Sequence, residues 1–157
     1  MKQFICCVSV ILFVFALAGC GKDTAALEPT FEGEIQATDG RVNYIAYCTA
    51  DEDGVSVTLT APESVAGIRY EVLGEELHTR LGKLDCITAA DSLPPASFVS
   101  LLHEVFGRTG DEEYTGTVDG EHFYTLKTRG GTVQIAAKGG RIRHIGADYG
   151  NWSITIS

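Results

Sequence analysis

Pairs of turn-forming residues divide the sequence into short runs, and they constrain the fold more than any other feature. Three such pairs, Asp119-Gly120, Gly130-Gly131 and Gly139-Gly140, separate four runs in the last third of the chain. Two-residue connections join only antiparallel neighbours, and glycine supplies the positive φ angles that they need. A last run follows the turn at 148–151. The spacing predicts a five-stranded antiparallel meander with strands at 113–118, 121–129, 132–138, 141–147 and 152–156.

The first half alternates polar and apolar residues with a period of two. From Phe31 to Ala37 the odd-numbered side chains are apolar or small, and the even-numbered ones are polar. This alternation is typical of a half-buried strand, which we expect at 31–38. Asp39-Gly40 is a hairpin turn signal. Further strands are expected at 42–49, 55–60, 66–73 and 75–81, with a shorter piece to about residue 87.

Between the two halves lies one segment with helical rather than strand periodicity. Residues 92–95 (Ser-Leu-Pro-Pro) precede it and Gly107 follows it. Proline fits a first helical turn and glycine fits the position after the last one. Phe98, Leu101, Leu102 and Val105 fall on one face of a helix over 96–106. We therefore predict an α+β fold: a curved antiparallel sheet, an incomplete barrel of about 10–11 strands, with this helix on its concave face. The alternative is a two-sheet sandwich with the helix at an edge.

The first 19 residues have the pattern of a secretory signal. Lys2 is followed by an apolar run that is too short for a comfortable membrane span, and small residues end it. Residues 17–20 (Leu-Ala-Gly-Cys) resemble the lipobox of bacterial lipoproteins. That resemblance implies cleavage before Cys20 and attachment of a diacylglycerol to its sulfur. We expect a signal peptide at 1–19, a lipidated tether at 20–30 and a β-rich domain at 31–157, anchored outside the cytoplasm to the cell membrane.

The charge balance excludes one class of partner and singles out one group of side chains. The chain has 21 acidic and 12 basic residues and a formal charge of −9, which argues against non-specific nucleic-acid binding. Between residues 121 and 147, however, basic side chains outnumber acidic ones. They are either a solvated face or a strip that meets anionic lipid headgroups or wall polymers. These residues are Lys127, Arg129, Lys138, Arg141 and Arg143.

Two cysteines remain in the expected mature domain, Cys48 and Cys86. Outside the cytoplasm they could form a disulfide, and the alternative is two separate, buried thiols. His122 and His144 are expected two strands apart, where a metal pair is conceivable but surface imidazoles are commoner. The sequence has no HExxH or GxSxG motif. We expect no metal site, no cofactor and no catalytic residue.

The order of the elements resembles that of a known family. A lipobox, a short tether, an antiparallel meander, a proline-led helix and a second meander are similar to the LolA/LolB/LppX-like lipoprotein superfamily. The stretch 57–67 (VTLTAPESVAG) and the helix after Leu93-Pro94 carry the resemblance. It implies an incomplete barrel covered by a helix, with an apolar cavity for lipid acyl chains. The family has no shared catalytic residues to carry over.

Two functions follow, and they differ in what fills the space between helix and sheet. The first is a non-catalytic, membrane-anchored lipoprotein that binds an apolar or amphipathic ligand, such as lipid, at the cell envelope. The alternative is an interaction or scaffolding lipoprotein with a solid core, which binds a partner protein, for instance in sporulation or germination. A hydrolase ranks third. In the first case the side chains lining the cavity are Phe98, Leu101, Leu102, Val105, Phe106, Tyr70 and Tyr124.

Overall fold

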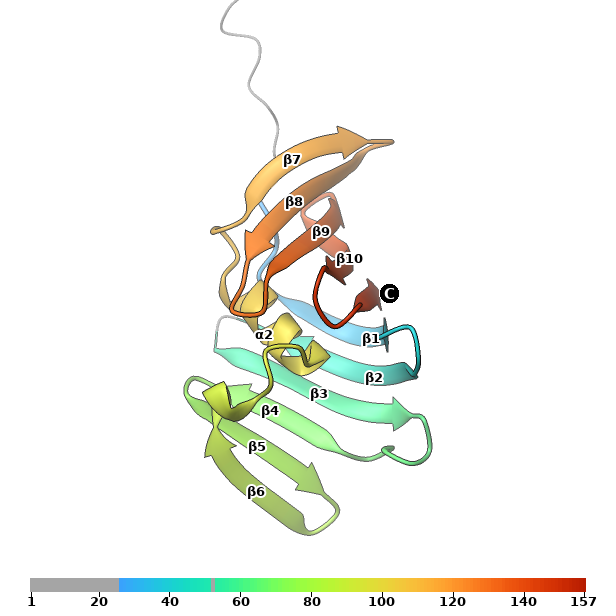
Figure 1. The fold of residues 1–157 in the computed structure, drawn as a ribbon, viewed down its shortest axis with the longest axis vertical. Helices are drawn as coiled ribbons and strands as arrows, with labels where there is room; N and C mark the ends of the chain where they lie inside the picture. The colour runs from blue at the N-terminus through green and yellow to red at the C-terminus, as the bar shows by residue number, and fades with distance from the viewer. Residues whose placement is uncertain (1–25, 52) are drawn as a thin grey trace, which may run out of the picture.

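The computed structural model describes residues 26–51 and 53–157, and within them eleven strands form one antiparallel sheet around one α-helix (Figure 1). The predicted curved sheet is confirmed, and the alternative of a two-sheet sandwich is not, because all eleven strands belong to a single sheet. The strands are β1 (Phe31–Thr38), β2 (Asn43–Ala50), β3 (Gly54–Ala61), β4 (Arg69–Leu73), β5 (Glu76–Leu81), β6 (Leu84–Ala89), β7 (Glu113–Val118), β8 (Glu121–Lys127), β9 (Thr132–Lys138), β10 (Arg141–Ala147) and β11 (Ser153–Ile156). The helix is α2 (Phe98–Gly107), preceded by the short 3-10 helix η1 (Ala90–Ser92).

The sheet consists of two meanders that meet at its centre. Strands β1 to β6 follow one another outward in one direction, and β11 to β7 do so in the other. The joint is the pairing of β1 with β11, from Ile35 opposite Ile156 to Thr38 opposite Ser153. Two segments far apart in the chain therefore form the middle of the sheet.

The helix lies inside the curve of the sheet (Figure 1). It packs along β3, and its residue Glu104 also binds Arg129 in the turn between β8 and β9. Strands β3 and β9 are five positions apart in the sheet order. Because one short helix contacts both β3 and the turn that leads into β9, the sheet must bend around it. The Ser97 side chain accepts a hydrogen bond from the Ser100 backbone N–H at 3.2 Å and caps the start of the helix, as expected for a serine at that position.

Among the element boundaries that differ from the sequence prediction, three have a clear local cause. The expected strand 66–73 begins only at Arg69, because residues 62–68 form a turn closed by bonds from Val65 N–H to Pro62 O and from Ile68 N–H to Val65 O. The helix begins at Phe98 rather than at residue 96, because Ser97 is its cap. The expected strand 121–129 ends at Lys127, because Arg129 turns toward the helix.

The folded domain also includes part of the expected tether. Leu27 is buried in the core, and the Glu28 N–H donates to Gly140 O at 2.9 Å. The Glu28 carboxylate pairs with Arg141 at 3.3 Å. Leu27 is thus part of the core and Glu28 is bound to the β9–β10 turn and Arg141, whereas the expected signal peptide and Cys20 lie outside the described residues.

Candidate functional site

The space between helix and sheet, where a lipid cavity was expected, is occupied by packed side chains. Of the seven expected lining residues, the five on α2 and Tyr124 are at most 6% exposed and belong to one continuous core, while Tyr70 is half-buried against it. Leu102 is fully buried and Leu101 is 1% exposed. This burial is typical of a well-packed interior.

Aromatic rings from the sheet and its loops pack against both ends of the helix. Near its start, Phe98 packs against both Tyr44 and Trp152, with ring centroids 5.6 and 5.3 Å away, and those two rings also contact each other at 6.0 Å. The Trp152 indole N–H donates to Ala96 O at 2.6 Å. At the other end Phe106 stacks on Phe31 at 6.2 Å. Contacts at such distances add to the energy of area burial, so they hold the helix against both meanders.

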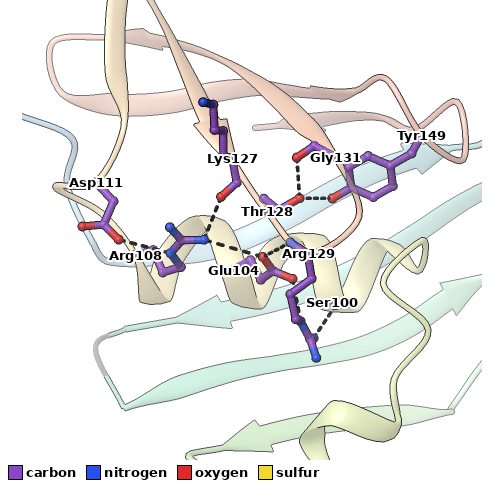
Figure 2. Close-up of polar contacts among 9 residues, drawn as sticks. All are labelled: Ser100, Glu104, Arg108, Asp111, Lys127, Thr128, Arg129, Gly131 and Tyr149. Atoms are coloured by element: carbon purple, nitrogen blue, oxygen red, sulfur yellow. Dashed lines mark hydrogen bonds and ion pairs between the residues drawn. The ribbon is translucent and has the colours of Figure 1, made fainter.

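A polar cluster joins the helix to the second meander (Figure 2). Glu104, only 7% exposed, accepts hydrogen bonds from the Arg129 backbone N–H and from Arg129 Nε, both at 3.0 Å. Arg129 Nη2 also donates to the buried Ser100 hydroxyl at 3.2 Å. Arg108 lies 3.9 Å from Glu104 and donates to Lys127 O at 2.8 Å. A buried carboxylate with these partners is a strong clamp, and we call these four side chains the helix clamp: Ser100, Glu104, Arg108 and Arg129.

The turn that carries Arg129 is itself held by Tyr149. The hydroxyls of Thr128 and Tyr149 are hydrogen-bonded at 2.8 Å, and the Tyr149 ring lies so close to Gly130 that a Cβ there would overlap it. Partial burial raises the pKa of the Tyr149 phenol. Position 130 therefore requires glycine because any larger side chain would overlap the Tyr149 ring, and not because the turn needs a positive φ there.

His103 sits beside the clamp. Burial, together with the nearby Arg129 charge, lowers the pKa of its imidazole, which keeps it neutral at physiological pH. Its Nδ1 is buried and has no hydrogen-bond partner within the described part of the chain. His103, Glu104, Arg108 and Arg129 line one wall of an open pocket of about 510 Å³, and the opposite wall comes from the β4–β5 turn and from η1.

A second open pocket lies at the other end of the core. Its volume is about 530 Å³, and Phe31, Phe106, Ile142 and Ile156 provide its apolar surface. Glu28, Glu32, Asp51, Arg141 and Arg143 supply charges of both signs. Phe106 is the one expected cavity residue that lines any of the pockets described for residues 26–51 and 53–157. The pockets are thus surface hollows of mixed polarity.

The basic residues of the expected cationic strip are divided by the structure into two groups. Lys127 and Arg129 lie at one end of the β8–β9 hairpin, while Lys138, Arg141 and Arg143 lie at or near the β9–β10 turn. The seven residues of β9 separate the groups by about 20 Å. Arg129 and Arg141 also bind carboxylates, Glu104 and Glu28.

The cysteine and histidine pairs are likewise separated. Cys48 is buried on β2, Cys86 is exposed on β6, and both are free. Three strands lie between β2 and β6, which corresponds to about 19 Å and exceeds the reach of a disulfide. The disulfide hypothesis therefore does not describe the structure, and of the two separate thiols expected in its place only Cys48 is buried. No group of three or more metal-ligating side chains occurs among the described residues.

The last candidate site is a part of the sheet that extends beyond the helix, formed by β4, β5 and β6. We call it the β4–β6 extension. All six residues of the edge strand β6 are exposed. Within the described residues six large hydrophobic side chains are exposed, and four of them lie here: Leu73, Leu81, Leu84 and Ile87. The cross-strand register places Leu81 opposite Leu84 on the face that carries the core, and Ile87 opposite His78 on the other face. A concentration of exposed apolar groups of this kind is typical of a binding surface.

The sequence analysis missed both the clamp and the extension. Ser100, Glu104 and Arg108 follow one another at intervals of four residues, which places them on one face of a helix and would have indicated the clamp. The extension had a weaker signal. Residues 84–89 (LDCITA) carry one charge and have no strict alternation, as is usual for an edge strand without a buried face.

Comparisons with known proteins concern the fold. No protein-family model matches the chain, and no curated protein sequence matches it. An uncharacterized conserved protein from Thermus thermophilus has a similar structure, with 12% identity and a TM-score of 0.51 over 86% of this chain and 78% of that one. The described residues contain no helix with the length and hydropathy needed to cross a membrane.

Two further solved structures match the chain at lower TM-scores. A LolA superfamily protein from Nitrosomonas europaea matches with 14% identity and a TM-score of 0.40 over 76% of this chain and 64% of that one. The structure of the CwlD amidase from Clostridioides difficile in complex with the GerS lipoprotein matches with 12% identity and a TM-score of 0.44 over 93% of this chain and 85% of that one. The structural match to a LolA superfamily protein is the one that the sequence resemblance predicted.

Proposed function

We propose that this chain is a non-catalytic, lipid-anchored protein of the cell envelope that binds a partner protein through the β4–β6 extension. The proposal unites the lipobox at Cys20 with the surface that the helix leaves uncovered. The observation that carries it is the contrast in packing. The helix and the strands around it form a filled interior, whereas the extension exposes apolar side chains on both faces.

This contrast favours partner binding over transport of an acyl chain. A carrier needs an enclosed apolar cavity of several hundred Å³, but the residues expected to line one are packed against each other. An apolar surface on the outside of a solid core suits a second macromolecule instead, because burying it removes apolar area from water.

The position of the anchor supports the same function. The described chain begins beside the β9–β10 turn, where Glu28 binds Gly140 O. Five residues separate Cys20 from Ala26, and they span at most about 21 Å. The β4–β6 extension lies at the opposite end of the long axis (Figure 1). From β10 to β6 there are seven strand steps, about 34 Å along the sheet. An acylated Cys20 thus leaves the extension pointing away from its own attachment point.

Site-specific photo-crosslinking in cells that produce the full chain tests the proposal. A photoreactive residue replaces Thr88 on β6, and the control carries it at Thr117, which is exposed on the opposite edge strand β7. We expect a discrete protein adduct at position 88 and none at position 117. The purified chain should carry no stoichiometric non-covalent lipid in native mass spectrometry. Absence of any protein adduct at position 88, or one bound lipid per chain, would contradict the proposal.

A further inference from the structure

The two edge strands of the sheet, β6 and β7, differ in regularity, and only β6 has a regular, unprotected edge with which another strand could pair. β7 is interrupted by a bulge between Tyr114 and Gly116. β6 pairs with β5 in regular register over all six residues, from Glu76 opposite Ala89 to Leu81 opposite Leu84, and contains no proline or lysine. Soluble proteins usually protect an edge by a bulge, a proline or a lysine, because unpaired backbone groups recruit further strands. β6 has none of these protections.

We propose that the strand received by β6 is β6 of a second copy of this chain, paired antiparallel about Ile87. The inference rests on the proposed function, since it names the partner of the β4–β6 extension. In this register Ile87 faces Ile87 of the second copy, Cys86 faces Thr88, and Asp85 faces Ala89. Residues directly opposite each other in an antiparallel pair share one face of the sheet, and each of these pairs meets that condition.

Charge complementarity favours a second copy and selects this register. Lys83 precedes β6 and Asp91 follows it in η1. Within the described part of the chain neither side chain forms an ion pair. Antiparallel pairing about Ile87 places Ala89, the last residue of β6, opposite Asp85 of the other copy. Lys83 of each copy then lies beyond that end, on the side where η1 of the other copy begins and carries Asp91, and this happens at both ends of the β6–β6 pair. Pairing about Cys86 would leave these charges unmatched, and pairing about Asp85 would place two carboxylates opposite each other, which is unfavourable.

The apolar side chains of the edge are also best used in this register. Ile87 is 58% exposed and Leu84 is 73% exposed. The two Ile87 side chains would cover each other on one face, and Leu84 would approach Ala90 of the second copy on the other. β6 is already paired with β5, and its backbone N–H and C=O groups that point away from β5 are paired within a sheet only when another strand lies beside them.

Cysteine crosslinking of the full chain in membranes tests the register directly. The variant Ile87→Cys/Cys86→Ser should form a disulfide-linked dimer under mild oxidation, because directly opposed residues bring their Cβ atoms within about 5 Å. Val118→Cys/Cys86→Ser is the matched control on β7, where Val118 is 61% exposed, and it should stay monomeric. Failure of the Ile87→Cys variant to crosslink, or equal crosslinking of the control, overturns the inference.

Dimer dissociation measured on the detergent-purified full chain tests the charges and the edge. Lys83→Glu should raise the dissociation constant roughly three- to tenfold, since the substitution changes the charge at both ends of the β6–β6 pair. The double variant Lys83→Glu/Asp91→Lys should restore it. Ile87→Lys should raise the constant at least about tenfold, whereas Val118→Lys should leave it unchanged. A monomer at every concentration, or a dimer insensitive to Ile87→Lys, overturns the inference.

The photo-crosslinking described above separates this inference from the proposed function. An adduct at position 88 with the mass of two copies supports both. An adduct with a different protein supports the proposed function and overturns the second-copy assignment. The lack of any protein adduct overturns both.

Discussion

The solid core can be tested by shortening one leucine that is buried under the helix. Leu102 is fully buried, and its neighbours Leu101 and Val105 are each 1% exposed. In a close-packed interior Leu102→Ala loses the transfer free energy of the removed groups and leaves a cavity that its neighbours fill only in part. We expect the free energy of unfolding to fall by about 3–4 kcal/mol, within the range of roughly 2–5 kcal/mol for such changes. That is a large fraction of the roughly 5–15 kcal/mol typical of a domain.

Urea unfolding followed by tryptophan fluorescence measures the loss, because Trp152 packs against Phe98 at the start of the helix. The midpoint should fall while the slope with urea stays constant, since the variant exposes the same surface on unfolding. Leu84→Ala is the matched control. Its side chain is 73% exposed, so the same substitution should change the stability by less than about 0.5 kcal/mol.

The opposite outcome would refute the packing argument. If α2 covered a ligand cavity, Leu102 would already border empty or lipid-filled space, and its truncation would cost about 1 kcal/mol or less. A Leu102→Ala variant as stable as Leu84→Ala, particularly one that co-purifies with more lipid, would therefore restore the carrier function.

Three more predictions concern the helix clamp, the thiols of Cys48 and Cys86, and His103. Arg129→Ala should lower the free energy of unfolding by about 2–3 kcal/mol in urea unfolding, because it removes the guanidinium that binds the buried Glu104 carboxylate at 3.0 Å. Arg108→Ala should cost clearly less, because Arg108 lies 3.9 Å from Glu104 and its hydrogen bond to Lys127 O is at the exposed surface. Equal losses would contradict the clamp geometry. At pH 8 a thiol reagent should label Cys86 rapidly and Cys48 only on unfolding, since burial raises the pKa of the Cys48 thiol to about 12. Mass spectrometry of the digested chain measures the labelling of each cysteine, and rapid labelling of Cys48 in the folded chain would contradict its burial on β2. The free energy of unfolding should fall as the pH drops below about 6.5, because His103 takes up a proton in the unfolded chain but stays neutral in the folded chain, where its pKa is lowered. His103→Gln should make this pH dependence shallower. An unchanged pH profile of that variant would show that His103 is not the source.

The local parts of this fold were predictable from the sequence, and the long-range parts were not. Alternation and two-residue turns act over a few residues, so the hairpins, the meanders and the helix could be inferred. The pairing of β1 with β11 joins segments more than 110 residues apart, and no local pattern records it. The disulfide hypothesis was wrong for the same reason, because no local pattern in the sequence shows that three strands lie between Cys48 and Cys86.

The candidate site was predictable only where side chains sit on one element. The helix periodicity identified the apolar face, but it did not distinguish a filled core from a cavity, since both need the same residue types. The basic strip shows the limit of counting charges along the chain. Lys127 and Lys138 are close in sequence, yet the length of β9 places them at opposite ends of a hairpin.

The pairing of β1 with β11 at the centre of the sheet also determines when, during synthesis, the complete sheet can form. β1 is among the first segments to be synthesised, and its neighbour β11 is made after every other strand described here. Until Ile156 has been added, each meander has an open inner border and the helix has only part of its surroundings. Closure over such a sequence separation is slow for entropic reasons, so the complete sheet forms only after β11 has been synthesised.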